Sequence, residues 1–309
     1  DANGAAAAKA VIAALHAAEG PVLALISGGG SALLPAPAGA LTLADKAKVN
    51  EMLLGSGLDI VAMNLIRQQL SDLKGGGFLR HAAPQPVTAL ILSDVIGDDL
   101  SAIASGPTVG PIGTAQEAIL LLKEAQLWAA LPQAVRQHLE TAQQPVALPA
   151  ARNMLVGSNA KSVAAMKEAA GAAHVIAEPI VGDVADAARL ICDRAVIGTT
   201  VWGGETTVVL RGSGRGGRNQ ELALRIALEA KRRGWRAWTC LQGGSDGRDG
   251  PTDAAGGLVD QDTLGKITDL DARLANNDSY AALDEAGDLL LTDATGTNVA
   301  DLGVMIRSG

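Results

Sequence analysis

The chain has 309 residues, enough for two domains of ordinary size, and 48% of them are hydrophobic. Its formal net charge of −8 argues against the basic face that nucleic-acid binding uses. No apolar run is long enough to cross a bilayer, and the first twenty residues lack the layout of a signal peptide, so we expect a cytoplasmic protein without a membrane partner.

In the first half, short apolar runs that end in Gly, Ser or Asp precede helical patterns, which predicts a parallel sheet with crossover helices. The expected helices are 5–18, 58–73 and 114–139, the last broken at Leu131–Pro132, and the expected strands are 21–26 and 87–92. The chain becomes polar and proline-bearing over 141–149, where we place a boundary. Residues 1–145 are therefore predicted to form a Rossmann-like α/β domain with helices on both faces of its sheet.

The second half, 146–309, is predicted to be another α/β domain. We expect helices at 160–170, 184–194, 221–232 and 262–267, and strands at 153–156, 174–177, 199–202, 205–211, 237–241 and 288–291. Gly203 and Gly204 separate two of these strands at a hairpin-like distance, so the sheet is expected to be mixed. Cys192 and Cys240 stand in apolar settings typical of buried free thiols. The four histidines show no spacing that pairs them with a nucleophile or a zinc ion.

Three glycines between two serines follow the first predicted strand, at Ser27–Ser31. The carboxyl ends of parallel strands form the ligand crevice of open α/β sheets. The segment has neither the Walker A nor the dinucleotide-binding spacing. It is either a tight turn or a cradle of backbone N–H groups for a phosphate or carboxylate, and the three glycines favour the cradle.

Asp94 ends the second predicted strand and is expected in the same crevice. There it could accept a hydroxyl proton or hold a metal, although a turn or N-cap role is the alternative. Lys74 follows the helix predicted over 58–73, where it either complements the helix dipole or contacts phosphate. Arg67 is expected on that helix, on the same face as Lys74.

The loop Gly212–Asn219 carries Arg215 and Arg218 and leads into a predicted helix. Cations are disfavoured at a helix N-terminus, so arginines there indicate an anion shared with the helix. We therefore expect the bare N–H groups of this loop and both guanidinium groups to face a phosphate.

A second glycine-rich turn carries Asp246, Asp249 and Asp253 after a predicted strand. Carboxylates are the oxygen ligands that Mg²⁺ prefers, so one or two of the three are expected to hold that ion. Asp253 alternatively caps the turn before Ala254.

Together these segments resemble the class II glycerate kinases, formerly named hydroxypyruvate reductases. The resemblance covers essentially the whole chain in ordered blocks, at 27–34, 70–76, 92–99, 104–108, 203–207, 214–222, 245–256 and 277–280. Residues 199–309 resemble the C-terminal MOFRL domain of these enzymes.

The resemblance implies ATP-dependent phosphorylation of D-glycerate, at the 2-hydroxyl, in a cleft between two α/β domains. It implies that Asp94 accepts the hydroxyl proton and that Arg218 steadies the transferring phosphoryl group. The residues then expected to bind the ATP cofactor are Ser27, Gly28, Gly29, Gly30, Ser31, Lys74, Glu205, Arg215 and Asn219. Those expected to bind Mg²⁺ are Asp246 and Asp249.

The same resemblance implies an N-terminal segment of roughly a hundred further residues, comparable to one small domain, which carries a lysine of the family's site. Lys9 does not match the context of that lysine. On this basis we expect the first domain to be incomplete at its start and the chain by itself to be a poor kinase, unless the segment is supplied elsewhere. A homodimer is compatible with the sequence.

Two other functions compete with glycerate phosphorylation. One is an NAD(P)H-dependent hydroxypyruvate reductase, although the chain lacks a G-x-G-x-x-G motif followed by an acidic residue. The other is a non-catalytic module that binds a nucleotide or another anion. The sequence leaves the choice between the 2- and 3-hydroxyl open, because it depends on substrate pose to within roughly an ångström.

Overall fold

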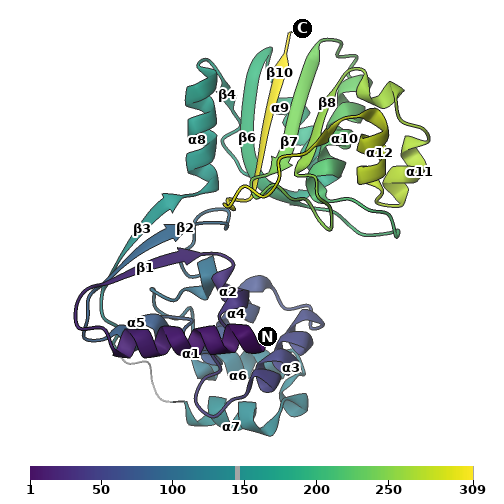
Figure 1. Ribbon diagram of the computed structural model, residues 1–309. Helices are drawn as coiled ribbons and strands as arrows, with labels where there is room; N and C mark the ends of the chain where they lie inside the picture. The colour runs from purple at the N-terminus through teal and green to yellow at the C-terminus, as the bar shows by residue number, and fades with distance from the viewer. Residues whose placement is uncertain (143–146, 309) are drawn as a thin grey trace. The chain divides into compact units, whose positions relative to one another are not determined.

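The computed structural model describes residues 1–142 and 147–308, which form two compact units (Figure 1). Unit 1 contains Asp1–Leu92 and Gly97–Val156, and unit 2 contains Ser93–Ile96 and the chain from Gly157 onward. Both units are of the α/β class, as predicted. Within the described ranges, no helix is long and apolar enough to span a membrane.

The sheet of unit 1 has the strand order β1 (Val22–Ser27), β2 (Val87–Leu92) and β3 (Ala151–Gly157). The strands β1 and β2 are parallel, as expected. We expected the strand after residue 150 to open the second domain, but β3 lies beside β2. The first compact unit therefore extends to Val156 rather than ending near residue 145.

Helices of unit 1 build a core of aliphatic residues to which no residue of a described strand contributes. Their bounds are α1 (Ala2–His16), α2 (Gly30–Leu33), α3 (Leu43–Leu54), α4 (Ile60–Gln69), α5 (Gly77–Ala82), α6 (Ala115–Glu124) and α7 (Gln133–Thr141), with 3₁₀ turns η1 (Ile103–Ser105) and η2 (Trp128–Ala130). Capping boxes at Thr42 and Thr114 begin α3 and α6. The apolar stripes of α3, α4 and α6 meet at Leu53, Ile66 and Leu122, which are fully buried.

The helix α4 ends at Gln69, so the predicted helix over 58–73 is too long. After Leu70 the chain becomes extended and pairs with the segment around Pro37. It then turns at Gly75 and Gly76, whose positive φ angles of 54° and 79° suit glycine. The expectation that Lys74 shares a helix with Arg67 is therefore wrong, because Lys74 lies beyond the helix end.

One side of the β1 strand is uncovered in the described part of unit 1. Leu23 is 63% exposed and Leu25 is 78% exposed, although both are apolar. Their in-register neighbours on β2, Thr88 and Leu90, are half-buried. The buried side of the sheet is formed instead by Ala89 and residues around it.

The sheet of unit 2 is mixed, as predicted. Its order is β4 (His174–Val175), β6 (Gly198–Thr207), β10 (Asp301–Arg307), β7 (Trp238–Gly244), β8 (Gly256–Asp260) and β9 (Leu289–Leu290), with β5 (Ile180–Asp183) also paired to β6. The strands β4 and β5 run parallel to β6, and the other pairings are antiparallel. The strand β10 therefore lies between β6 and β7 (Figure 1).

The predicted hairpin at Gly203–Gly204 is wrong, because β6 runs through both glycines without a turn. The two glycines instead allow close packing. A Cβ atom on Gly203 would collide with the side chain of Asn159, and one on Gly204 would collide with the backbone of Ile180. Their missing side chains let α8 and β5 approach β6.

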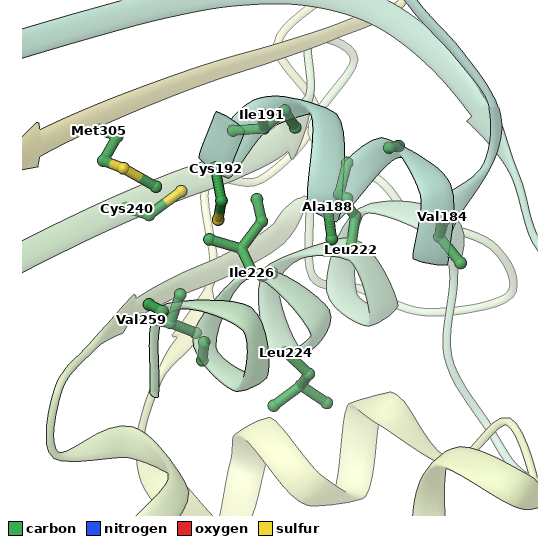
Figure 2. Packing of buried hydrophobic residues seen from close by; sticks show 14 of the residues in the cluster. Val184, Ala188, Ile191, Cys192, Leu222, Leu224, Ile226, Cys240, Val259 and Met305 are labelled. Carbon is green, nitrogen blue, oxygen red and sulfur yellow. The ribbon is translucent and has the colours of Figure 1, made fainter. Parts of the chain in front are cut away.

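The helices of unit 2 cover both faces of the sheet. Their bounds are α8 (Asn159–Ala170), α9 (Val184–Arg194), α10 (Arg218–Arg232), α11 (Leu270–Ala275) and α12 (Ser279–Ala286), with a 3₁₀ turn η3 (Thr263–Gly265). Figure 2 shows Ile191 and Cys192 of α9 and Ile226 of α10 beside Cys240 and Met305 of the sheet. Both cysteines are free and buried, as predicted, and burial raises the pKa of the Cys192 thiol to about 12.

Candidate functional site

An arginine held by carboxylates lies at the start of α10 in unit 2. The Arg218 Nε donates to Asp301 Oδ2 at 2.6 Å, and its Nη2 donates to Asp301 Oδ1 at 3.0 Å. Its Nη2 also lies 3.4 Å from Glu205 Oε1. This two-point contact fixes the plane of the guanidinium group. The Nη1 atom has no hydrogen-bond partner among the described residues, so one edge of the group can bind a further acceptor.

Asp94 belongs to the same unit as Arg218 rather than to the first one. It is half-buried, and burial raises its pKa. The pKa of Glu205 is also raised, chiefly by burial, although the positive charge of Arg218 opposes this. The negative charge of Asp94 adds to the increase. The structure thus brings Asp94, Glu205 and Arg218 together, as three of the residues singled out from the sequence.

Asp249 caps α10. Its two carboxylate oxygens accept from the backbone N–H groups of Asn219 at 3.1 Å and Gln220 at 2.8 Å. It therefore occupies the donors that an anion would otherwise use. Because the carboxylate is only 3% exposed, burial raises its pKa to about 6, against these hydrogen bonds.

The predicted Mg²⁺ ligands do not form a recognisable metal centre in the described ranges. Asp249 is engaged by the helix, and the Oδ1 of Asp246 accepts from the N–H of Arg248 at 3.0 Å. Among the residues that the structure describes, no group of three or more His, Cys, Asp or Glu side chains could hold a metal ion. The assignment of Mg²⁺ to Asp246 and Asp249 stays a prediction.

The expectation of bare N–H groups in the glycine-rich loop before α10 is wrong for residues 211–215. The segment at the start of α12 already binds them. The contacts are Arg211 N and Gly212 N with Asn277 Oδ1 at 2.6 and 3.1 Å, Ser213 N with Asn276 Oδ1 at 3.0 Å, Gly214 N with Asn276 O at 2.8 Å, and Arg215 N with Asp278 Oδ1 at 3.1 Å. A Cβ atom on Gly212 or Gly214 would collide with this segment, so the glycines serve close packing.

Two residues predicted to bind the cofactor are engaged elsewhere in unit 2. Asn219 is 1% exposed, donates to Asp301 Oδ1 at 2.9 Å and accepts from Gln242 Nε2 at 2.6 Å. Arg215 lies 4.3 Å from the ring centre of Tyr280 and 3.3 Å from Asp253 Oδ1. Asn219 therefore supports the carboxylate that holds Arg218, whereas Arg215 belongs to an exposed cluster.

In unit 1 the serine-glycine loop and Lys74 come together, as the sequence suggested. The Lys74 Nζ donates to Ser31 Oγ at 3.0 Å, and Ser31 Oγ lies 2.8 Å from Ser105 Oγ. Ser31 N donates to Gly28 O at 3.2 Å, so the segment also closes a tight turn. Gly28, Ser31 and Lys74 line a pocket of about 470 Å³.

The remaining residues of this loop lie beside that pocket. Ser27 ends β1, Gly29 precedes α2, and Gly30 begins it. Ser27 and Gly30 line a second, largely apolar pocket that shares Lys74 with the first. The turn and the ligand-site interpretations are therefore both compatible with the geometry.

Two contributors were not recognised as site residues from the sequence. No local motif singles out Asp301, because its partners lie 82 and 83 positions away along the chain. Lys46 lines the 470 Å³ pocket from α3, a helix that we did not predict. The capping box of Thr42 and Asp45 was an available signal for the start of that helix.

Comparisons with known proteins cover nearly the whole chain. Residues 1–140 match the family described as Domain of unknown function (DUF4147), and residues 198–301 match the MOFRL family. The chain is 37% identical to the glycerate kinase of Danio rerio, over 92% of this chain and 70% of that protein. It is 37% identical to the glycerate kinase of Homo sapiens, over 91% of this chain and 66% of that protein.

A bacterial relative matches in both sequence and fold. The chain is 38% identical to the D-glycerate 2-kinase of Thermotoga maritima, over 91% of this chain and 71% of that protein. The crystal structure of a Thermotoga maritima glycerate kinase superimposes with a TM-score of 0.89 at 35% identity, covering 99% of this chain and 78% of that one. Because sequence and fold agree over most of its length, the chain belongs to the glycerate kinase family.

Proposed function

We propose that this chain transfers a phosphoryl group from ATP to the 2-hydroxyl of D-glycerate. The observation that carries the proposal is the 38% identity to a D-glycerate 2-kinase over 91% of the chain. This similarity favours phosphoryl transfer over the reductase and over the non-catalytic module. The half-buried Asp94 and the carboxylate-held Arg218 support it chemically.

Asp94 is the residue that accepts the substrate proton. Burial raises its pKa, which makes its carboxylate a stronger base than an exposed aspartate. The proton of the 2-hydroxyl moves to Asp94 while the substrate oxygen bonds to phosphorus and the bond from phosphorus to the leaving ADP oxygen breaks. ATP supplies the phosphoryl group when it is bound.

Arg218 steadies the transferring phosphoryl group by a directed hydrogen bond. Asp301 and Glu205 hold the guanidinium on the Nε and Nη2 side, which leaves Nη1 as a donor of fixed direction. Preorganised donors of this kind stabilise developing charge because they need no reorientation during the reaction.

In unit 1, Lys74 and Ser31 are suited to hold the phosphates of the nucleotide. Their hydrogen-bonded pair lines a pocket together with Gly28, and a lysine presents a point charge to phosphate. We expect Mg²⁺ to accompany the nucleotide. A cytoplasmic location and a homodimer stay predictions, which cell fractionation and light scattering would check.

Phosphorus NMR of the products tests the proposal directly. The chain is mixed with ATP, Mg²⁺ and D-glycerate. We expect 2-phosphoglycerate and ADP, with turnover as low as the resemblance to kinases with a further N-terminal segment implies. A product signal of 3-phosphoglycerate would keep the kinase but overturn the regiochemistry. NADH oxidation with hydroxypyruvate, in the absence of any phosphorylated product, would overturn the proposed function.

A further inference from the structure

The pocket of unit 1 that Lys74 lines has two further cationic side chains in its wall, for which the proposed function gives no role. The pocket of about 470 Å³ is also lined by Lys46 of α3 and Arg67 of α4. Its volume is within the range of small-molecule sites. Asn50 and Ser31 add neutral polar groups to its wall.

None of the three cations forms an ion pair with a described residue. Each is bound by a neutral oxygen instead. The contacts are Lys46 Nζ to Leu70 O at 3.0 Å, Lys74 Nζ to Ser31 Oγ at 3.0 Å, and Arg67 Nη2 to Asn50 Oδ1 at 2.6 Å. The Arg67 Nε is buried and has no hydrogen-bond partner within the described chain. A buried guanidinium donor without an acceptor is costly unless a ligand supplies one.

The positive charges of these side chains also lower the pKa values of the two lysines. Burial and then the charge of Lys74 lower the pKa of Lys46 to about 7. Burial and then the charge of Arg67 lower the pKa of Lys74 to about 8. Two acidic groups face this region: Asp72, which acts on Lys46 in the opposite direction, and Asp1, which lines the pocket. Neither is ion-paired to the three cations, so they offset the positive charge of the pocket only in part.

We propose that Lys46, Arg67 and Lys74 together bind the phosphate groups of a phosphorylated small molecule in this pocket. Three cations match the two or more negative charges of a phosphate or polyphosphate better than the single charge of a carboxylate. The planar fork of Arg67 can contact two phosphate oxygens, while the lysines act as point charges. The inference rests on the proposed function only for the source of the phosphate, which is either ATP or the phosphorylated product.

Titration calorimetry on the full chain tests the site with four probes, namely tripolyphosphate, ATP, 2-phosphoglycerate and D-glycerate. We expect tripolyphosphate to bind, and Lys46→Met and Arg67→Met to weaken it at least tenfold. Lys48→Met is the matched control, because Lys48 lies on the same helix but is exposed and paired with Glu51. It should change the affinity less than twofold. Binding should also take up protons between pH 7 and 8, measured in buffers of different ionisation enthalpy, because an anion raises the lowered lysine pKa values.

The probes separate the sources of phosphate. Tighter binding of ATP than of 2-phosphoglycerate assigns the nucleotide, and the reverse order assigns the product; both outcomes support a phosphate site. D-Glycerate that binds as tightly as tripolyphosphate, with the same losses in the variants, would overturn it in favour of a carboxylate site. Equal losses in Lys46→Met and Lys48→Met, or no binding of any phosphate, would also overturn it.

Two further measurements keep this result independent of the kinase and of folding. If phosphate binds but the NMR sample contains no phosphorylated glycerate, the phosphate site stands and the proposed function is refuted. If the chain phosphorylates glycerate but the variants bind phosphate as well as the parent chain, the proposed function stands and the phosphate site is refuted. If Arg67→Met does not fold, Arg67→Lys replaces it. That variant keeps the charge but loses the fork, and we expect it to bind tripolyphosphate more weakly than the parent chain.

Discussion

In unit 2 the arginine at the start of α10 is held by carboxylates, whereas in unit 1 the three cations around the 470 Å³ pocket are held by neutral oxygens. The pairing in unit 2 fixes a side chain in one orientation and leaves no net positive charge, because two carboxylates face one guanidinium. The arrangement in unit 1 stores positive charge that no described carboxylate neutralises. The difference teaches that the charges of unit 2 are organised for positioning, and those of unit 1 for recruiting an anion.

The largest expected effect is in unit 2, at its half-buried base. Asp94→Asn removes the proton acceptor and should lower kcat about 10²- to 10⁴-fold, with a smaller change in KM. Asp98→Asn is the control, because Asp98 has a positive φ of 57° that asparagine also tolerates. Coupled assays of ADP release measure both variants. Equal activity of Asp94→Asn and the parent chain would contradict the assigned role.

The pairing of Arg218 predicts a large loss of stability. Asp301→Ala leaves the guanidinium and the Asn219 amide without their shared acceptor and should lower the free energy of unfolding by about 3 kcal/mol. We choose the low end for buried pairs because the Arg218 side chain is 35% exposed. Asp253→Ala, which breaks the exposed pair with Arg215, should cost under about 1 kcal/mol. Urea denaturation compares the two, and similar losses would show that the pairing in unit 2 is not special.

In unit 1 the removal of a cation should increase the free energy of unfolding rather than lower it. The pKa of Lys46 falls from 10.5 to about 7 on folding, so the folded state binds fewer protons than the unfolded chain between these values. Its unfavourable effect is therefore complete below pH 7 and fades as the pH rises toward 10.5. Lys46→Met should raise the free energy of unfolding by about 1 kcal/mol at pH 6 and by less at pH 10.

Denaturation at the two pH values, with Lys48→Met in parallel, measures this difference. Lys48 is exposed and paired with Glu51, so its variant should show no such dependence on pH. A Lys46→Met variant that is destabilised equally at both pH values would mean that the lysine contributes packing rather than excess charge. The conclusion that unit 1 carries an excess of positive charge at this pocket would then be refuted.

A smaller effect is expected at the capping carboxylate of α10. The pKa of Asp249 rises from 3.8 to about 6 on folding, so between these values the folded state binds more protons than the unfolded chain. Its contribution to stability is therefore complete below about pH 4 and falls as the pH rises toward 6. Asp249→Asn also loses part of the cap, worth about 1 kcal/mol, and should be more destabilising at pH 4.5 than at pH 7.

Urea denaturation at pH 4.5 and pH 7 measures the loss of stability in Asp249→Asn. If an arginine were paired with Asp249, it would lower the pKa of this carboxyl group, and Asp249→Asn would then be more destabilising at pH 7 than at pH 4.5. A loss that grows between pH 4.5 and pH 7 would thus indicate that the cap is paired with a cation in solution.

Local patterns were sufficient for much of the fold. The strand Val87–Leu92 and the helix Val184–Arg194 were predicted to the residue, because apolar spacing and flanking breakers define them within a short window. The strand β10 was missed although it is central in its sheet, since its pairing partners are distant in sequence. Asp301 begins that strand, so its role was missed as well.

Glycines misled the sequence interpretation twice, and for one physical reason. The sequence predicts a turn at Gly203 and Gly204 and an anion-binding loop at Gly212–Asn219. In both places the missing Cβ makes room for another segment of the chain, at Asn159 in the first case and Asn276 in the second. Turn, cradle and close approach need the same residue type, so only tertiary contacts distinguish them. The meeting of Lys46, Arg67 and Lys74 likewise depends on how α3 and α4 pack.

The attachment of the glycine-rich loop to the start of α12 has a consequence for hydrogen exchange. Asn277 accepts from Arg211 N and Gly212 N and donates to Val209 O at 3.1 Å and Glu221 Oε2 at 3.3 Å. Amides of a glycine-rich surface segment ordinarily exchange within the fastest class, but the amides of 211–215 are all bonded here. We expect all five to exchange slowly in deuterium, and the amides of Arg211 and Gly212 to become fast in Asn277→Ala, because Asn277 is the acceptor of these two. The loop is thus a rigid connection between α10 and the start of α12, held by three consecutive residues, Asn276, Asn277 and Asp278.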